Sequence, residues 1–265
     1  MSSCEVLRRQ DIWSCGGGTQ SGAIAVLIGT GKLPKPDRAF MTDTGRERSG
    51  TWVFVDGFIR PQLAKVGLEL EIVRASDFSD HLEPVYTSQS GELTVLLPMF
   101  TNINGTVGKL SSFCSGKWKS DVGERWMRSV GITHARNWIG ISVDEVSRLR
   151  NQHRTWLELW YPLVLNRETR MTRARCVDLI RSAGWHDVIP HSACWMCPNA
   201  SDSEWIDMKN NFPQDFELAC AIERQIQVQD PNAFLHPSCV PLSRVEFGIQ
   251  HTMFADRGCT TGCFT

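Results

Sequence analysis

The sequence lacks several features that would define a class of function. No run reaches 18 apolar residues, so we expect no membrane span. No apolar segment follows Met1–Glu5, as one would in a signal peptide. Basic and acidic residues nearly cancel, 28 against 29, which excludes a generally basic nucleic-acid binder. We therefore expect a cytoplasmic protein without membrane contact.

Two tyrosines stand against ten tryptophans and ten cysteines. In a reducing compartment, cysteines serve as metal ligands, catalytic groups or buried thiols more often than as disulfides. The cysteines are therefore the first candidates for function.

Strand-like and helix-like segments alternate along the first part of the chain. This order predicts an α/β fold with an open, mostly parallel sheet and flanking helices. The expected strands are 11–15, 38–42, 69–74, 137–141 and 157–163, and the expected helices are 21–28, 50–66, 143–150 and 172–183.

The chain divides by composition. We expect residues 1–190 to form a nucleotide-binding α/β domain, with an insertion at about 76–115. A hairpin strand is expected at 92–97 within that insertion. Residues 191–265 are predicted to form a Cys-rich portion that is helical over 202–229 and completes a metal or iron–sulfur site.

A glycine triplet, Gly16–Gly18, lies between the first predicted strand and helix. Glycines there let the backbone approach a ligand, and the free amides of a helix N-terminus suit phosphate. A tight turn is the alternative. The dinucleotide-binding fingerprint does not fit, because it needs glycine where Ser21 stands. A Walker loop ending at Lys32 would need Ser or Thr at Leu33, so it does not fit either.

Five cysteines lie in three loop clusters. Cys194 and Cys197 form a Cys-x-x-Cys, Cys259 and Cys263 form a pair near the end, and Cys114 precedes a predicted helix. Four thiolates suit a [4Fe–4S] cluster or Zn²⁺, and spacing does not separate the two. In a simpler interpretation, only the Cys-x-x-Cys pair is functional and the two cysteines near the end are incidental.

The glycine loop resembles the PP-loop of ATP pyrophosphatases, Ser-Gly-Gly-x-Asp-Ser, in the form found in sulfonucleotide (PAPS) reductases. Gly17, Gly18 and Ser21 match, whereas Gly16 and Gln20 stand at the family's first Ser and its Asp. The segment 43–47, Asp-Thr-Gly-Arg-Glu, resembles the next motif of the same superfamily.

The cysteine clusters resemble one branch of that superfamily. It contains phage-encoded PAPS reductase proteins and the sulfurtransferase of DNA phosphorothioation. The resemblance implies an adenine nucleotide alpha-hydrolase-like fold, ATP with Mg²⁺, and a [4Fe–4S] cluster, with Zn²⁺ as the alternative. It also implies a bacterial or phage-infected host cell as the setting. The implied cluster ligands are Cys114, Cys194, Cys197 and one of Cys259 and Cys263.

The resemblance also assigns the nucleotide site. The phosphates are expected on the glycine loop, and Asp43 is expected to contact the ribose or a metal. Strand ends meet at one edge of an open sheet, which brings these motifs together. The implied nucleotide-binding residues are Gly16, Gly17, Gly18, Thr19, Gln20, Ser21, Asp43, Thr44, Gly45, Arg148, Thr172 and Arg173.

The implied activity has two steps: ATP adenylates an acceptor oxygen, and sulfur from a cluster or a cysteine persulfide then displaces AMP. Cys259, Cys263 and Asp43 are the expected catalytic residues. A sulfonucleotide reductase that releases sulfite is the alternative. A catalytically degenerate nucleotide-binding module is a third interpretation, which Gln20 supports.

Charge is distributed unevenly along the chain. Between Arg148 and Arg181, eight arginines stand against three acids. Basic segments with interleaved tryptophans predict phosphate gripping and base stacking, whereas a solvated helix face with core tryptophans is the alternative. The expected partners are ATP or a sulfonucleotide, DNA or RNA as acceptor, and a cysteine desulfurase or thioredoxin-type donor.

Overall fold

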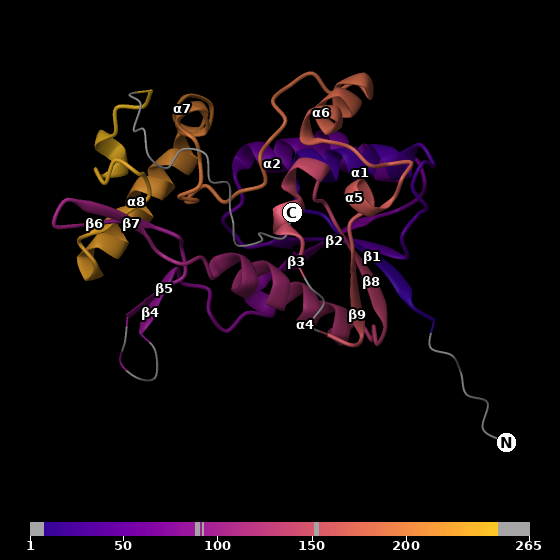
Figure 1. The fold of residues 1–265 in the computed structure, drawn as a ribbon, viewed down its shortest axis with the longest axis horizontal. Helices are drawn as coiled ribbons and strands as arrows, with labels where there is room; N and C mark the ends of the chain where they lie inside the picture. Colours follow the sequence, from indigo (N-terminus) through magenta and orange to yellow (C-terminus); the bar gives the residue numbers. More distant parts are fainter. Residues whose placement is uncertain (1–7, 88–90, 92, 151–153, 249–265) are drawn as a thin grey trace.

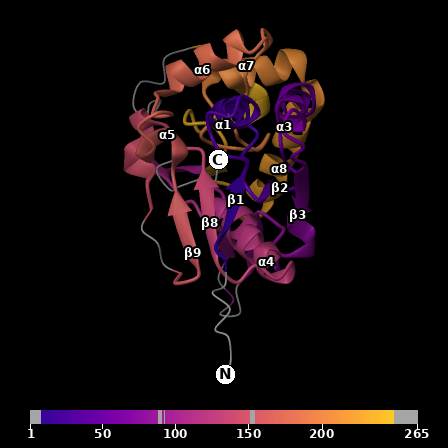
Figure 2. The ribbon, with the colours of Figure 1, turned by 90° about the vertical axis from the view of Figure 1, so that its right-hand side faces the viewer.

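A five-stranded parallel sheet lies at the centre of the computed structural model, which describes residues 8–87, 91, 93–150 and 154–248. The strand order is β3-β2-β1-β8-β9 (Figure 2). The predicted open α/β sheet is confirmed, and all its pairings are parallel. The strands are β1 (Gln10–Ser14), β2 (Arg38–Asp43), β3 (Leu70–Arg74), β8 (Ala135–Ile139) and β9 (Leu157–Trp160).

The order of strands reverses beside β1. The chain runs from β1 outward to β2 and β3, and it returns on the other side of β1 as β8 and β9. Loops after β1 and β8 therefore diverge at the carboxyl edge of the sheet. Ligands of open α/β sheets bind at such a switch point.

Helices cover both faces of the sheet (Figure 1). Trp13 packs with helix α1 (Thr19–Gly29) and helix α6 (Arg173–Ser182) on one face. Its neighbour Ile12 packs with helix α4 (Asp121–Ser129) on the other face. This alternation is what a strand buried on both sides requires.

The helix predicted over 50–66 is one helical stretch of three parts: α2 (Ser49–Phe54), a π-helical turn (Val55–Ile59) and α3 (Arg60–Ala64). Pro61 is the second residue of α3 and directly follows the π-helical turn. The α-helix predicted over 143–150 is wrong. A 3₁₀-helix spans Val143–Arg148, and Glu145 inside it has a non-helical backbone.

Two further boundaries differ from the prediction. The strand expected to reach residue 163 ends at Trp160, because Pro162 starts the short helix α5 (Pro162–Leu165). The helical region 202–229 is two helices, α7 (Asp202–Asn211) and α8 (Pro213–Gln229), which meet at Phe212.

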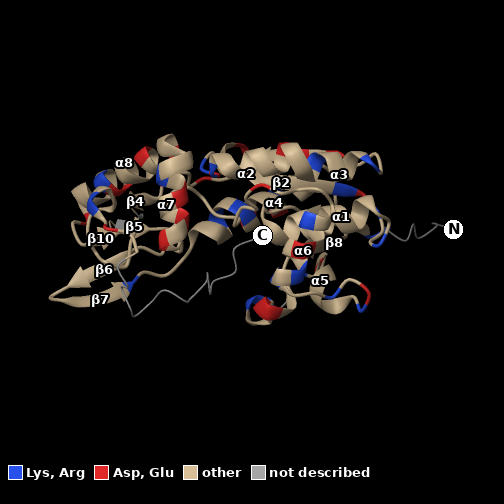
Figure 3. Cartoon of the chain, turned by 90° about the horizontal axis from the view of Figure 1, so that it is seen from above, with Lys and Arg blue, Asp and Glu red and all other residues tan. Residues whose placement is uncertain are grey.

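A second lobe lies beside the sheet (Figures 1 and 3). It contains the hairpin of β4 (Val85–Thr87) and β5 (Leu93–Val95), which confirms the strand expected within 92–97. Its other sheet joins β6 (Phe100–Ile103) to β7 (Thr106–Lys109) and to β10 (Ala233–Phe234). Residues from the insertion and from the C-terminal portion share one apolar core. The domain division at residue 190 stays a prediction.

Glu223 on α8 binds the segment 235–242 that follows this helix. Its side chain accepts the amide hydrogens of Leu235 and Leu242 at 2.8 and 2.5 Å, and the residue is 1% exposed. Burial raises the pKa of this carboxyl. No helix in the described part of the chain is long and apolar enough to cross a bilayer.

Replacing Glu223 with alanine is expected to lower the free energy of unfolding by about 3 kcal/mol, because two buried amides lose their acceptor. Urea denaturation measures this change. Glu217→Ala is the matched control, since Glu217 is exposed on the same helix. Equal destabilisation by the two variants would contradict the role given to Glu223.

Candidate functional site

The glycine loop joins the end of β1 to the start of α1. Gly17 has a φ of +74°, which glycine adopts without strain. The Gly16 amide donates to Ser21 Oγ at 2.9 Å and so closes the loop. No side chain caps α1 at Gly18, which suits an anion at this helix start.

The segment 190–194 lies across this loop. The Ser192 hydroxyl donates to the carbonyl oxygen of Gly16, and Thr19 Oγ1 donates to the carbonyl oxygen of Pro190 at 3.5 Å. A methyl group on Gly18 would lie 2.8 Å from the Ser192 amide nitrogen. All residues from 16 to 21 are buried.

The space beside the loop is small. About 10 Å³ lies between the ends of β1 and β2, next to Cys15, Gly16 and Lys119. Burial raises the pKa of the Cys15 thiol to about 11, so this thiol is neutral at physiological pH. The segment 190–194 covers the loop on the side of Ser192.

Gln20 spans the switch point between β1 and β8. Its amide nitrogen donates to Ser142 Oγ at 3.3 Å and to the Glu145 carboxylate. Glu145 also pairs with Arg148. An aspartate at position 20 would place two carboxylates in contact and would favour a cation between them. Gln20 instead closes this edge with an uncharged amide that donates to the Glu145 carboxylate.

The second predicted motif lies at the end of β2. Asp43 Oδ1 accepts the Gly45 amide hydrogen at 2.7 Å, so the aspartate stabilises the turn that follows the strand. The Thr44 hydroxyl donates to Glu47 Oε1 at 3.1 Å. Gly45 has a φ of +69° and is exposed. Asp43 therefore shapes the loop at the sheet edge.

The Cys-x-x-Cys segment is attached to this second motif. Cys194 Sγ lies 3.8 Å from Thr44 Oγ1, and the backbones of Cys194 and Glu47 form an antiparallel bridge. The Trp195 amide donates to the Arg46 carbonyl oxygen at 2.9 Å. The structure thus brings residues about 150 positions apart in sequence together at the carboxyl edge of β2.

Three of the five predicted metal ligands are described. A turn with a 3.1 Å hydrogen bond joins Cys194 to Cys197, and Cys114 packs against the same core as Cys194. Burial raises the pKa of Cys194 to about 12, and the charges of Glu47, Cys197 and Cys114 add to the rise. Cys259 and Cys263 lie outside the described residues.

The donor set fits a soft metal in kind, since thiolates are the ligands of iron–sulfur clusters and Zn²⁺. Over the residues that the structure describes, no group of three or more His, Cys, Asp or Glu side chains is arranged to hold a metal ion. The metal centre therefore stays a prediction that depends on the C-terminal pair.

Sequence reasoning missed Lys119, Glu47 and Ser192. Lys119 Nζ lies 3.4 Å from Glu47 Oε1, and the Glu47 side chain is fully buried. Lys119 also lines the small space beside the glycine loop and so brings positive charge to it. The two lysines that follow Cys114 are the sequence signal that pointed toward this charge.

The predicted nucleotide-binding residues Thr172 and Arg173 lie at the start of α6. Thr172 caps α6 by accepting the Arg175 amide hydrogen at 3.3 Å, and Asp144 accepts the Arg173 amide hydrogen at 3.0 Å. Basic and acidic side chains are interspersed over the helices (Figure 3). Several arginines between 148 and 181 bind partners within the chain through their side chains: Arg148, Arg154, Arg175 and Arg181.

The four interleaved tryptophans serve the fold. Trp118 and Trp126 are buried. Trp156 lies under Arg128 at 4.4 Å, and Trp160 lies under Arg136 at 4.7 Å from the ring centre. These positions match the expectation of core tryptophans, and the nucleic-acid partner stays a prediction.

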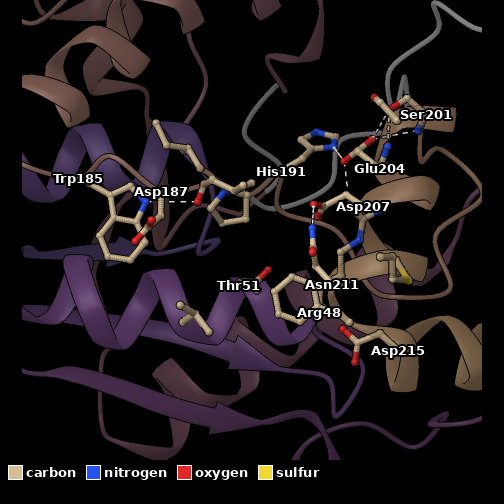
Figure 4. Close-up of a pocket in the computed structure, with 18 of the residues that line it drawn as sticks. Arg48, Thr51, Trp185, Asp187, His191, Ser201, Glu204, Asp207, Asn211 and Asp215 are labelled. Atoms are coloured by element: carbon tan, nitrogen blue, oxygen red, sulfur yellow. Dashed lines mark hydrogen bonds and ion pairs between the residues drawn. The ribbon is translucent and has the colours of Figure 1, made fainter.

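A cavity of about 720 Å³ opens between the first turns of α2, the segment 185–191 and α7 (Figure 4). At one end, Glu204 pairs with Arg48 at 2.9 Å and with His191 at 3.3 Å. Burial alone would raise the pKa of Glu204, but the His191 hydrogen bond and the Arg48 charge hold it well below its ordinary value.

A depressed carboxyl pKa contributes stability above the unfolded value of 4.5 and loses it as pH falls through the folded value. We expect the wild type to lose stability steadily below about pH 4.5. Glu204→Gln is expected to flatten this dependence, as measured by urea unfolding at a series of acid pH values. Glu168→Gln, which changes an exposed carboxylate, is expected to leave the slope unchanged. An unchanged slope in Glu204→Gln would count against the assignment.

No protein-family model matches the chain, and no curated protein matches it. Among solved structures, the chain is similar to the U34-tRNA thiolase NcsA from Methanococcus maripaludis, determined with its [4Fe–4S] cluster. The identity is 15% and the TM-score 0.41, over 91% of this chain and 75% of that one. At these values the function has to be argued from the site itself.

Proposed function

We propose that this protein is an ATP-dependent sulfurtransferase of the PP-loop type, which adenylates and thiolates a nucleic acid or nucleotide. One observation carries the proposal: the Cys-x-x-Cys segment touches both nucleotide motifs. Ser192 binds the carbonyl oxygen of Gly16, and Cys194 contacts Thr44. Thiols and a phosphate-type loop therefore meet at one edge of the sheet.

The glycine loop and the start of α1 would hold the phosphates, and Lys119 would add positive charge beside them. In the first step, an acceptor oxygen bonds to the α-phosphorus while the α–β phosphoanhydride bond breaks and pyrophosphate leaves. In the second step, sulfide-level sulfur bonds to the acceptor carbon or phosphorus, and AMP leaves with the oxygen.

The cysteine thiols are of the ligand type that holds an iron–sulfur cluster. Cys114, Cys194, Cys197 and one of Cys259 and Cys263 would hold it, and it would supply a site that binds sulfur. The other terminal cysteine would remain as a catalytic thiol together with Asp43 at the strand end. A cysteine desulfurase is the proposed sulfur donor, and a thioredoxin-type protein is the proposed donor of the two electrons that bring persulfide sulfur to the sulfide level.

A second candidate function is a nucleotide-binding module without turnover. The uncharged amide of Gln20, which donates to Glu145, favours it, because an aspartate stands at this point in the family.

Anaerobically purified protein, incubated with labelled ATP and with total cellular nucleic acid as the acceptor, tests the proposal. Release of pyrophosphate, together with iron and acid-labile sulfide in the protein, is the expected result. Sulfite released from a sulfonucleotide and thioredoxin, without ATP, would instead show a reductase. ATP binding without pyrophosphate release would favour the module.

A further inference from the structure

The cavity between α2 and α7 is separate from the glycine loop. None of residues 16–21 lines it, although Thr51 on its wall lies against Gly17. Its volume of about 720 Å³ falls in the range of small-molecule sites. Figure 4 shows side chains from α2, the segment 185–191 and α7 around one space.

Two glycines in the helical stretch 49–64 pack against aromatic rings that line this cavity. A methyl group on Gly50 would lie 3.2 Å from the Phe212 ring, and one on Gly57 would lie 3.0 Å from the Trp185 ring. Gly50 lies in α2, and Gly57 lies in the π-helical turn that follows it. Trp185 Nε1 donates to the Val188 carbonyl oxygen at 3.2 Å, and this bond fixes the indole.

Acceptor oxygens outnumber cationic groups in the lining. Glu204 is matched by Arg48 and His191, and Asp215 accepts the Ser49 amide and hydroxyl at 2.7 and 2.9 Å. Asp207 accepts from Asn211 at 2.8 Å and keeps a second carboxylate oxygen. The charged side chains of the lining are Arg48, Arg173, Asp187, Glu204, Asp207 and Asp215.

We propose that this cavity binds an uncharged or cationic heteroaromatic amine of the nucleoside class. Aromatic walls suit a planar ring. Carboxylates accept hydrogen from an exocyclic amine or from ribose hydroxyls. The excess of acids disfavours a polyphosphate, which separates this site from the glycine loop. The binding does not depend on sulfur transfer, whereas naming the ligand as the acceptor would rest on the proposed function.

Titration calorimetry with adenosine, cytidine, inosine and uridine tests the proposal. Adenosine and cytidine, which carry the exocyclic amine, are expected to bind about tenfold more tightly than inosine and uridine, which lack it. AMP is expected to bind more weakly than adenosine. Equal binding of all four nucleosides, or tighter binding of AMP, would overturn the proposal.

Two variants test whether the nucleoside binds in this cavity. Val53 lines the cavity and is 55% exposed, so Val53→Trp fills the mouth and is expected to weaken nucleoside binding by about tenfold or more. Val228→Trp is the matched control, because Val228 is 85% exposed on α8 and outside the cavity. Unchanged binding in Val53→Trp would sink the inference.

Asp207→Asn is expected to reduce adenosine binding more than inosine binding, and Asp178→Asn on α6 serves as its control. An equal loss for both nucleosides would contradict the role of the carboxylate. Pyrophosphate release is measured on the same proteins. If wild type binds adenosine, Val53→Trp weakens that binding, and no pyrophosphate is released, the proposed function fails and the cavity assignment stands.

Discussion

Replacing Gly18 with alanine is expected to lower the free energy of unfolding by about 1–3 kcal/mol, the usual cost of overpacking. The new methyl group would lie 2.8 Å from the Ser192 amide nitrogen and 2.9 Å from its Cβ. Backbone at Ser192 cannot rotate away as a flexible side chain would. The segment 190–194 therefore has to shift, and Cys194 shifts with it.

Two measurements check this result. Urea denaturation gives the stability, and mass spectrometry after alkylation gives the accessibility of Cys194, which is expected to rise. Gly116→Ala is the matched control, because a methyl group there meets nothing within 4 Å. Alanine is the better helix former by about 1 kcal/mol, so this control is expected to be neutral or stabilising. Wild-type stability and alkylation in Gly18→Ala would show that the segment does not bear on the loop.

Replacing Cys194 with serine is expected to lower sulfur transfer by at least about 100-fold. Removing a group that only supports a metal ligand already costs about 10- to 100-fold, and Cys194 is a proposed ligand. Iron and sulfide content is expected to fall with activity. Among the described cysteines, Cys194 has a sulfur contact with the strand-end motif, at Thr44.

Cys239→Ser is the control for this variant. Cys239 is half-buried and belongs to none of the three cysteine clusters. It is expected to keep both iron and activity. Equal iron content in wild type and Cys194→Ser would remove Cys194 from the proposed ligand set, and equal activity would remove it from the reaction.

The sheet was predictable because its signals are local. Buried strands such as 38–43 are short apolar runs, and glycines mark the turns that follow. The helix predicted over 143–150 was wrong because of contacts that particular residues make. The segment Val143–Arg148 has helical spacing and begins with a capping box of Ser142 and Glu145, yet Glu145 has a non-helical backbone, and its carboxylate also accepts from Gln20. Side-chain bonds from another element decided that backbone.

The sequence predicted which residue types form the candidate site. It predicted fewer of the contacts between them. Motif spacing placed the glycine loop and the segment 43–45 at one edge. It did not reveal that Ser192 covers the loop or that Gln20 bonds to Glu145. The basic segment 148–181 looked like a phosphate-binding face, yet several of its arginines pair within the chain.

The sequence by itself determined the α/β sheet, the glycine loop between its first strand and helix, and the spacing of the cysteines in Cys-x-x-Cys, because each depends on residues close together in the chain. The tertiary structure alone decided that Cys194 touches Thr44, that Lys119 pairs with Glu47, and that α2 and α7 enclose a cavity. These contacts join residues far apart in sequence. They depend on how the second lobe packs against the sheet, and no local pattern encodes that packing.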